Sequence, residues 1–179
     1  MSLFLWIALA RGAVLSFGST DGSIGFHAVA SLHEFDGKAG NFSGSLDTTL
    51  LTGTLVLQAA SLTTALGPRD ERMREYCLET EHFSDIRFDV SSITGSLEGF
   101  QAQRGSGGIF LVGLLTIRDV SQKMQVPATY SWENGGLRLT GRVPLHWADF
   151  GIPDPSVVMS TLSPEITVQF DILAKTAEP

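Results

Sequence analysis

Apolar and polar residues alternate strictly along much of this chain, and this two-residue period constrains the fold more than any other feature. Between positions 137 and 147 every second residue is apolar apart from Gly141. The same period runs through 86–90, 124–132 and 166–172. Such a period places one face of a β-strand in a core and the other face in water. The sequence therefore predicts a mostly β protein.

Further strands and their turns support this prediction. Segments 54–57 and 109–117 are apolar on both faces, which is typical of strands that are covered from outside as well. Alternation over 24–28 indicates an early strand. Asn134-Gly135-Gly136 separates two alternating runs, and these residues tolerate the positive φ of tight hairpin turns. Short strands at near-regular spacing predict a closed sheet or a sandwich.

One segment breaks the period and predicts a helix. Pro68 suits the first helical position, and a charged stretch follows it to about His82. Met73, Tyr76 and Cys77 are spaced i, i+3 and i+4, so they share one helix face. We expect this helix over residues 68–82, near one end of the sheet, with its Arg and Glu side chains in water. No other segment has a convincing helical period.

The charge balance argues against a nucleic-acid partner. The chain has 12 Lys and Arg against 19 Asp and Glu, which gives a formal net charge of −7. Charge of that sign repels a phosphate backbone. Cys77 is the only cysteine, so an internal disulfide and every zinc motif with two thiolates are excluded. We expect Cys77 to be a small buried hydrophobe.

Residues 1–14 are predicted to be a leader, and residues 15–176 a single domain. Leu3–Ala10 is apolar but shorter than the ~18 to 20 residues that span a bilayer, so no membrane-spanning segment is expected. The block has the length of a signal-peptide core and small residues after it, although the positive n-region is missing. A signal peptide, a trimmed remnant packed on the domain edge and a cloned start all stay open.

The sequence contains none of the common catalytic motifs. It has no Gly-x-Ser-x-Gly elbow, no His-Glu-x-x-His helix, no phosphate loop and no dinucleotide fingerprint. His33, Glu34 and Asp36 lie close in sequence, but His33 and Asp36 would not share a face of a strand, so a metal site is not favoured. His27 and His146 fall on polar strand faces and are expected at the surface.

Five short motifs follow one another along the chain. They are Ser23-Ile24-Gly25-Phe26, the Gly-rich segment 37–44, Arg69-Asp70-x-Arg72-Met73-Arg74 with Phe83-Ser84-Asp85-Ile86-Arg87-Phe88, the segment 113–121, and Asp149-Phe150-Gly151-Ile152. Each motif alone is weak. In this order and spacing they resemble the YceI-like family, the polyisoprenoid-binding, lipocalin-like proteins of bacteria, over about Leu15–Ala174.

The chain departs from the family pattern at three places. Asp21-Gly22 stands where the family usually has a His-Ser pair, so a head-group contact from that histidine has no counterpart here. Ser84 replaces a common Pro, and Asp119 replaces the usual Gly of a hairpin. Asp tolerates left-handed turns, so the hairpin is expected to form.

The resemblance implies an all-β fold: an extended antiparallel eight-stranded lipocalin-like barrel with the helix near one end. It implies a hydrophobic channel that holds a long-chain isoprenoid or related acyl lipid, with no enzymatic activity and no cofactor. It also implies a periplasmic or secreted protein, or a cytoplasmic one if residues 1–13 are no signal remnant. A homodimer stays open.

The inward positions of the alternation are the candidates for the channel lining. An eight-stranded barrel is about the size at which the interior is either filled by side chains or holds one ligand. Each candidate therefore either lines a channel or packs in a solid core, and the sequence leaves both open. The candidates are Phe26, Phe42, Ile86, Phe88, Leu114, Trp132, Leu139, Val143, Val168 and Phe170.

Two other functions stay open beside lipid binding. The first is a small-molecule enzyme in a similar barrel, with a histidine and Asp149 or Glu34 converging on the channel. The second is a stress-response interaction module with a filled core, whose exposed helix 68–82 meets a partner. The volume of the interior separates the second from a lipid carrier.

Overall fold

The computed structural model describes residues 14–133, 135–157 and 160–176. Residues 1–13 of the predicted leader and Asn134 of the expected turn lie outside the described residues. Eleven strands form one antiparallel sheet. The strands are β1 (Val14–Gly18), β2 (Gly22–Ala30), β3 (Glu34–Ala39), β4 (Phe42–Asp47), β5 (Thr52–Gln58), β6 (Leu62–Thr63), β7 (Asp85–Gly95), β8 (Ser106–Ile117), β9 (Val120–Glu133), β10 (Gly136–His146) and β11 (Leu162–Thr176).

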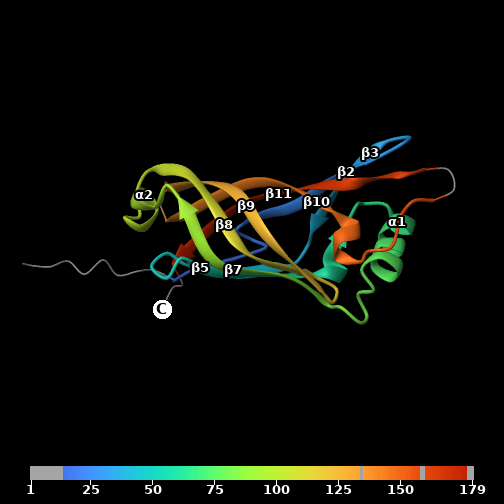
Figure 1. Ribbon diagram of the computed structural model, residues 1–179, viewed down its shortest axis with the longest axis horizontal. Helices are drawn as coiled ribbons and strands as arrows, with labels where there is room; N and C mark the ends of the chain where they lie inside the picture. Colours follow the sequence, from blue (N-terminus) through green and yellow to red (C-terminus); the bar gives the residue numbers. More distant parts are fainter. Residues whose placement is uncertain (1–13, 134, 158–159, 177–179) are drawn as a thin grey trace, which may run out of the picture.

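The sheet closes into an eight-stranded barrel, as expected. Its strands run in the order β1-β4-β5-β7-β8-β9-β10-β11, and β11 pairs with β1 through Leu15↔Thr176. Beyond this ring, β11 also pairs with β2, β2 with β3, and β3 with β6. In the sequence, β2 follows β1, β3 precedes β4 and β6 follows β5. These three strands therefore lengthen one side of the barrel. The result is the elongated shape in Figure 1.

Turn residues connect these strands at positions where the sequence predicts turns. Gly135 has φ 101°, the left-handed region that a tight hairpin needs, and Gly136 pairs with Glu133 across the β9–β10 hairpin. Between β1 and β2, the backbone N–H of Gly18 donates to Oδ2 of Asp21 at 2.9 Å. Asp21 thus closes the short break between these two strands.

The alternation predicts most inward faces correctly, but one expectation about β8 is wrong. Inward Ile109, Leu111 and Ile117 are buried, whereas outward Phe110 and Leu114 are 42% and 45% exposed. The outer face of β8 is therefore apolar without being covered at these positions. An apolar run on both faces is a sign of two-sided burial only where a second layer exists.

The predicted helix is present and shorter than expected. Helix α1 (Gly67–Arg72) has Pro68 in its first turn and continues into a π-helical turn, Met73–Cys77. The N–H of Leu78 donates to the carbonyl of Met73 at 2.9 Å, the five-residue spacing of a π turn. This wider turn leaves Tyr76 45% exposed while Cys77 is buried.

A second helix, α2 (Leu97–Gln101), lies at the opposite end of the barrel from α1 (Figure 1). Five residues are too few to show a helical period, so the sequence does not predict it. None of the helices among the described residues has the length and apolar character needed to cross a bilayer.

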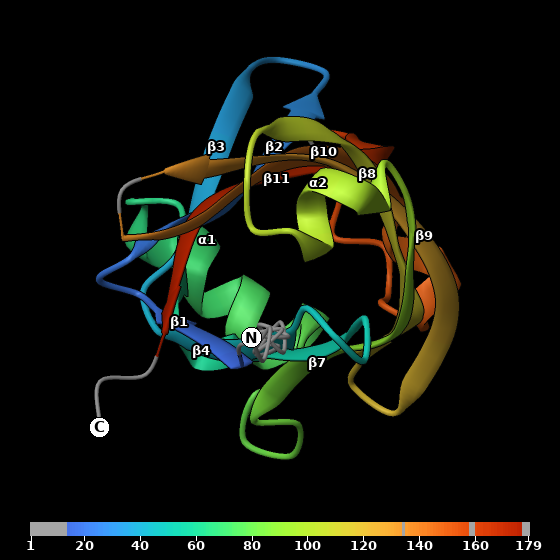
Figure 2. The ribbon, with the colours of Figure 1, turned by 90° about the vertical axis from the view of Figure 1, so that its left-hand side faces the viewer.

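Side chains fill the barrel at the α2 end. Phe100 of α2 is completely buried, and its ring meets that of Tyr130 edge to face, with 5.3 Å between the centroids. The indole N–H of Trp132 donates to the carbonyl oxygen of Phe100 at 3.2 Å. Viewed from this end, α2 lies across the opening (Figure 2). We call Phe100, Tyr130 and Trp132 the α2 plug.

Candidate functional site

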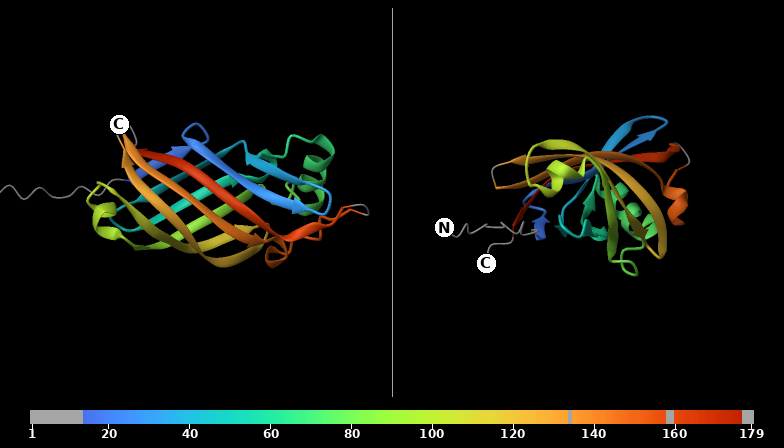
Figure 3. Two further views of the ribbon diagram at one scale, coloured as in Figure 1. Left: turned by 90° about the horizontal axis from the view of Figure 1, so that it is seen from above. Right: turned by 60° about the vertical axis from the view of Figure 1, so that its left-hand side comes forward.

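An apolar cavity of about 560 Å³ extends from the middle of the barrel to the α1 end. Its walls come from the inward faces of the barrel strands, from α1 and from residues within 152–157 and 160–162. Figure 3 shows that α1 and the β2–β3 hairpin both lie at this end of the elongated barrel. The rim includes Leu66 and Val157, which are 50% and 52% exposed, so the cavity reaches the surface there.

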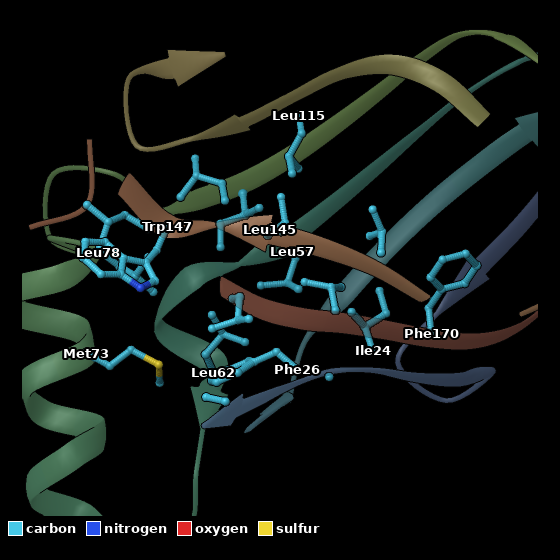
Figure 4. A pocket seen from close by; sticks show the side chains of 18 of the residues that line it. Ile24, Phe26, Leu57, Leu62, Met73, Leu78, Leu115, Leu145, Trp147 and Phe170 are labelled. Carbon is cyan, nitrogen blue, oxygen red and sulfur yellow. The ribbon is translucent and has the colours of Figure 1, made fainter. Parts of the chain in front are cut away.

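Side chains from distant parts of the sequence converge on this cavity, as Figure 4 shows. Leu57, Leu115 and Phe170 come from three different strands, and Met73 and Leu78 from the helical segment. The residues of the α2 plug do not line it. The cavity is therefore a blind pocket that is closed by α2 and open near α1.

Three glycines help to keep the barrel hollow. Phe17, Phe26 and Phe170 each lie directly across a strand pair from a glycine, namely Gly44, Gly37 and Gly141. A Cβ built on each of these glycines would come within 2.1–2.5 Å of the opposing phenyl ring. Each ring thus occupies the space that a side chain at the opposing glycine would fill.

Gly37→Ala is expected to narrow the cavity. The three atoms nearest to its new Cβ all belong to the Phe26 ring, so that ring must rotate toward the interior while the backbone keeps its place. We expect the longest chain that a fatty-acyl series can insert to shorten by a few carbons. Gly108→Ala, at an exposed position of β8 where a Cβ meets nothing within 4 Å, is the control for a glycine substitution away from the cavity. Unchanged chain-length preference in Gly37→Ala would contradict this role of glycine.

Most of the sequence-derived candidates lie on the cavity wall. The seven that do so are Phe26, Ile86, Phe88, Leu139, Val143, Val168 and Phe170. That these residues contact a ligand stays a prediction.

Three candidates lie elsewhere. Phe42 is 3% exposed and packs in the core without reaching the cavity. Trp132 belongs to the α2 plug. The inward placement of Leu114 is wrong, because it pairs with outward Asp89, whereas Leu115 pairs with inward Phe88. A one-residue change of phase reverses the face of a strand residue, and between 109 and 117 only Thr116 is a polar residue that marks that phase.

The neighbours Leu114 and Leu115 provide a matched pair for substitution. We expect Leu115→Asp to reduce lipid uptake by about 100-fold or more, because a bound chain would dehydrate a carboxylate on the wall. Leu114→Asp places the same group in water and is expected to change both uptake and stability little. Titration with a fluorescent fatty-acyl probe measures uptake, and the reverse ranking would contradict the assignment of faces.

The contribution of α1 and of residues within 152–157 and 160–162 to the cavity was not predicted from the sequence. Met73 and Cys77 share a face, as the spacing predicts, and both line the wall. The sequence thus reveals the apolar face of the helical segment, but it does not reveal which residues that face packs against. Burial raises the pKa of the Cys77 thiol, so the thiol stays protonated, as expected for a buried hydrophobe.

The described residues do not bring a histidine and a carboxylate together on the cavity wall. His27 lies 3.0 Å from Asp36 and 3.5 Å from Glu34, and His146 lies 3.9 Å from Asp149. None of these five side chains lines the cavity. The described residues contain no cluster of three or more His, Cys, Asp or Glu side chains that could hold a metal ion. The pairing that the enzyme alternative requires is therefore not formed on this wall.

A buried carboxylate organises the rim beside α1. Burial of Asp70 disfavours its ionised form, but hydrogen bonds from the Thr63 hydroxyl and from the hydroxyl and N–H of Thr64 outweigh burial and lower its pKa below the ordinary 3.8. The Thr63 hydroxyl donates at 2.6 Å and the Thr64 N–H at 2.7 Å. Asp70 thus ties the start of the helical segment to β6 and the residue after it.

Acid is expected to weaken this tie. A carboxyl whose pKa is lower in the folded state stabilises the fold above its unfolded pKa near 3.8, and that stability is lost as the pH falls through the folded value. Asp70→Asn should cost about 1–3 kcal/mol at neutral pH and flatten the decline below about pH 4. Urea unfolding at several pH values measures both. Asp119→Asn, an exposed control, should keep the wild-type pH profile, and an identical profile in Asp70→Asn would contradict the assignment.

A closed eight-stranded barrel with a blind apolar pocket defines a lipocalin-like barrel. A family model described as the YceI-like domain matches residues 17–174. The chain belongs to the YceI-like family. A comparison with curated proteins finds no match.

Solved structures share this fold at low sequence identity. A polyisoprenoid binding domain from Saccharophagus degradans, implicated in plant cell wall breakdown, superposes with a TM-score of 0.76 at 15% identity, covering 93% of this chain and 100% of that one. BcnA from Burkholderia cenocepacia gives 0.72 at 15% identity, covering 87% and 96%. The Campylobacter jejuni YCEI protein gives 0.58 at 15% identity, covering 100% and 91%. Likeness at this identity supports the fold.

Proposed function

We propose that this protein binds the chain of a long isoprenoid or related acyl lipid inside its barrel, as a non-catalytic carrier or store. The cavity of about 560 Å³ carries this proposal. A water molecule occupies about 30 Å³ and a methylene group is of similar size, so the cavity holds on the order of 20 such groups. That exceeds a ten-carbon chain and argues against a filled core. The polyisoprenoid binding domain from Saccharophagus degradans adds support.

The apolar wall supplies enough free energy for such binding. Removing one methylene group from water contributes roughly 0.8 kcal/mol. About 12 methylenes therefore contribute on the order of 10 kcal/mol, more than the ~4 kcal/mol at the lower end of the cost of association. An alkyl or prenyl chain fits this wall without any polar anchor along its length.

Native mass spectrometry of gently purified protein tests the proposal. We expect a mass increment from a co-purified lipid, which organic extraction removes. The emptied protein should then take up polyprenyl and fatty-acyl probes in a one-to-one ratio. Protein that purifies empty and takes up neither probe would overturn the proposal.

We further propose a periplasmic or secreted location. Cell fractionation combined with the intact mass of the mature protein tests it: recovery in the cytoplasm with residues 1–13 attached would contradict it. The homodimer stays a prediction, which light scattering of the purified protein checks.

A further inference from the structure

The charged side chains on the cavity wall are all cationic. Among the described residues that line the cavity, Arg69 and Arg72 carry charge, and no Asp, Glu or Lys is present. This contrasts with the net charge of −7 of the whole chain. Both arginines lie in α1 at the open end, three residues apart, which places their side chains on neighbouring positions of one helix face. Two like charges on one face repel each other unless an anion lies between them.

Among the described residues, no acidic side chain forms an ion pair with either arginine within 4.0 Å. Two nearby acidic residues accept hydrogen bonds from other groups, and Glu71, beside Arg72, is exposed. Asp70 accepts hydrogen bonds from Thr63 and Thr64, and Asp154 accepts one from the N–H of Ser156 at 2.9 Å. The positive charge at the opening is therefore not neutralised by a salt bridge.

The Arg69 guanidinium is held in place by neutral groups. Its Nε donates to the Thr64 hydroxyl at 2.7 Å and its Nη2 to the Thr64 carbonyl at 3.0 Å. Its Nη1 lies 3.4 Å from Nε2 of His33, which also lines the cavity. Its Cζ lies 3.9 Å from the centroid of the Phe35 ring. The Thr64 hydroxyl in turn donates to Asp70, so the buried carboxylate positions Arg69 through a threonine.

Arg72 is held in a similar way. Its Nε and Nη2 donate to the carbonyls of Pro155 and Ser156, each at 3.3 Å, and its Cζ lies 4.5 Å from the centroid of the Tyr76 ring. Each guanidinium has five N–H donors. Both therefore keep N–H groups without an acceptor among the described residues, and both are half-buried, which strengthens an electrostatic contact.

We infer that Arg69 and Arg72 form a head-group site for an anionic amphiphile, a lipid that ends in a phosphate or carboxylate. This inference rests on the proposed function, because the chain of the same molecule occupies the cavity. Arginine forks match phosphate and carboxylate oxygens with paired hydrogen bonds. The ligand lies with its head at α1 and its tail toward the α2 plug. An anionic lipid binds more tightly than a neutral lipid with the same chain.

Competition experiments with three probes test the inference. Hexadecyl phosphate, hexadecanol and inorganic phosphate compete with a fluorescent fatty-acyl probe bound to the full chain, and calorimetry measures the binding of inorganic phosphate directly. We expect hexadecyl phosphate to bind about ten-fold or more tighter than hexadecanol, the difference that one charged hydrogen bond supplies. Added salt should reduce this preference.

The double variant Arg69→Gln, Arg72→Gln should lose the preference and bind the two alkyl probes with similar affinity. Thermal unfolding of the empty variant shows whether the barrel is intact. Arg104→Gln, an exposed arginine near α2, is the matched control and should keep the preference. Equal binding of the two alkyl probes by the wild type, or a preference that survives the double substitution, would overturn the head-group site while lipid binding stands.

The remaining outcomes distinguish a free anion from the head group of a lipid. Inorganic phosphate that binds as tightly as hexadecyl phosphate would replace the amphiphile with a free anion and overturn the inference. If neither alkyl probe binds, the proposed function itself fails.

Discussion

Phe88→Asp is expected to reduce lipid uptake by about 100-fold or more while the barrel still folds. Phe88 lies on the cavity wall and is 8% exposed. In the empty protein, water in the cavity can hydrate a carboxylate at this position. A bound chain would remove that water, at a cost of several kcal/mol for an unpaired charge. Titration with a fatty-acyl probe measures uptake, and thermal unfolding of the empty protein measures stability.

Two controls make this result specific. Phe88→Leu keeps an apolar side chain and should retain uptake within about ten-fold. Phe110→Asp, on the exposed face of β8, places the same charge in water and should change neither quantity much. Parallel losses of uptake and stability in Phe88→Asp would indicate a solid core around this residue and contradict the cavity wall.

Phe100→Ala is expected to have the opposite effect, a large loss of stability with little change in lipid affinity. Phe100 is completely buried in the α2 plug and packs edge to face on Tyr130. Truncating a buried Phe to Ala typically costs about 3–5 kcal/mol, from the lost burial and the remaining void. Urea unfolding monitored by tryptophan fluorescence measures this loss.

The control for this truncation is Leu50→Ala, at a site that is 71% exposed, where a change within about 0.5 kcal/mol is expected. The lipid affinities of Phe100→Ala and the wild type are compared without urea, because the folded state dominates there. A Phe100→Ala protein of wild-type stability would show that the α2 end is not a packed plug.

Periodicity predicted the barrel because polar residues mark the outer face of most strands. In β10, for example, Arg138 and Thr140 identify the outer face, and Leu139 and Val143 face inward as expected. In β8 the outer positions Phe110, Val112 and Leu114 are apolar, and Thr116 is the one polar residue between 109 and 117 that marks the outer face. A single polar residue is a weak signal of phase, and the error at Leu114 follows from this.

The hollow interior was harder to predict than the strands. Whether Phe26 fills the barrel or lies on its wall depends on Gly37, which stands across a strand pair from it. That pairing depends on register, which the alternation of a single strand does not contain. The opening likewise depends on the contact of α1 with residues 155–156, which lie about 80 positions away in the sequence, as Arg72 and Pro155 do.

A crystal structure with a terminally brominated long-chain fatty acid shows whether the barrel holds the chain of a lipid. Anomalous scattering locates the bromine independently of how the chain is traced. We expect a bromine peak inside the barrel, between the Phe88 region and the α2 plug, with the carboxylate toward α1. A peak on the outer surface, or an interior closed by its own side chains, would contradict this expectation.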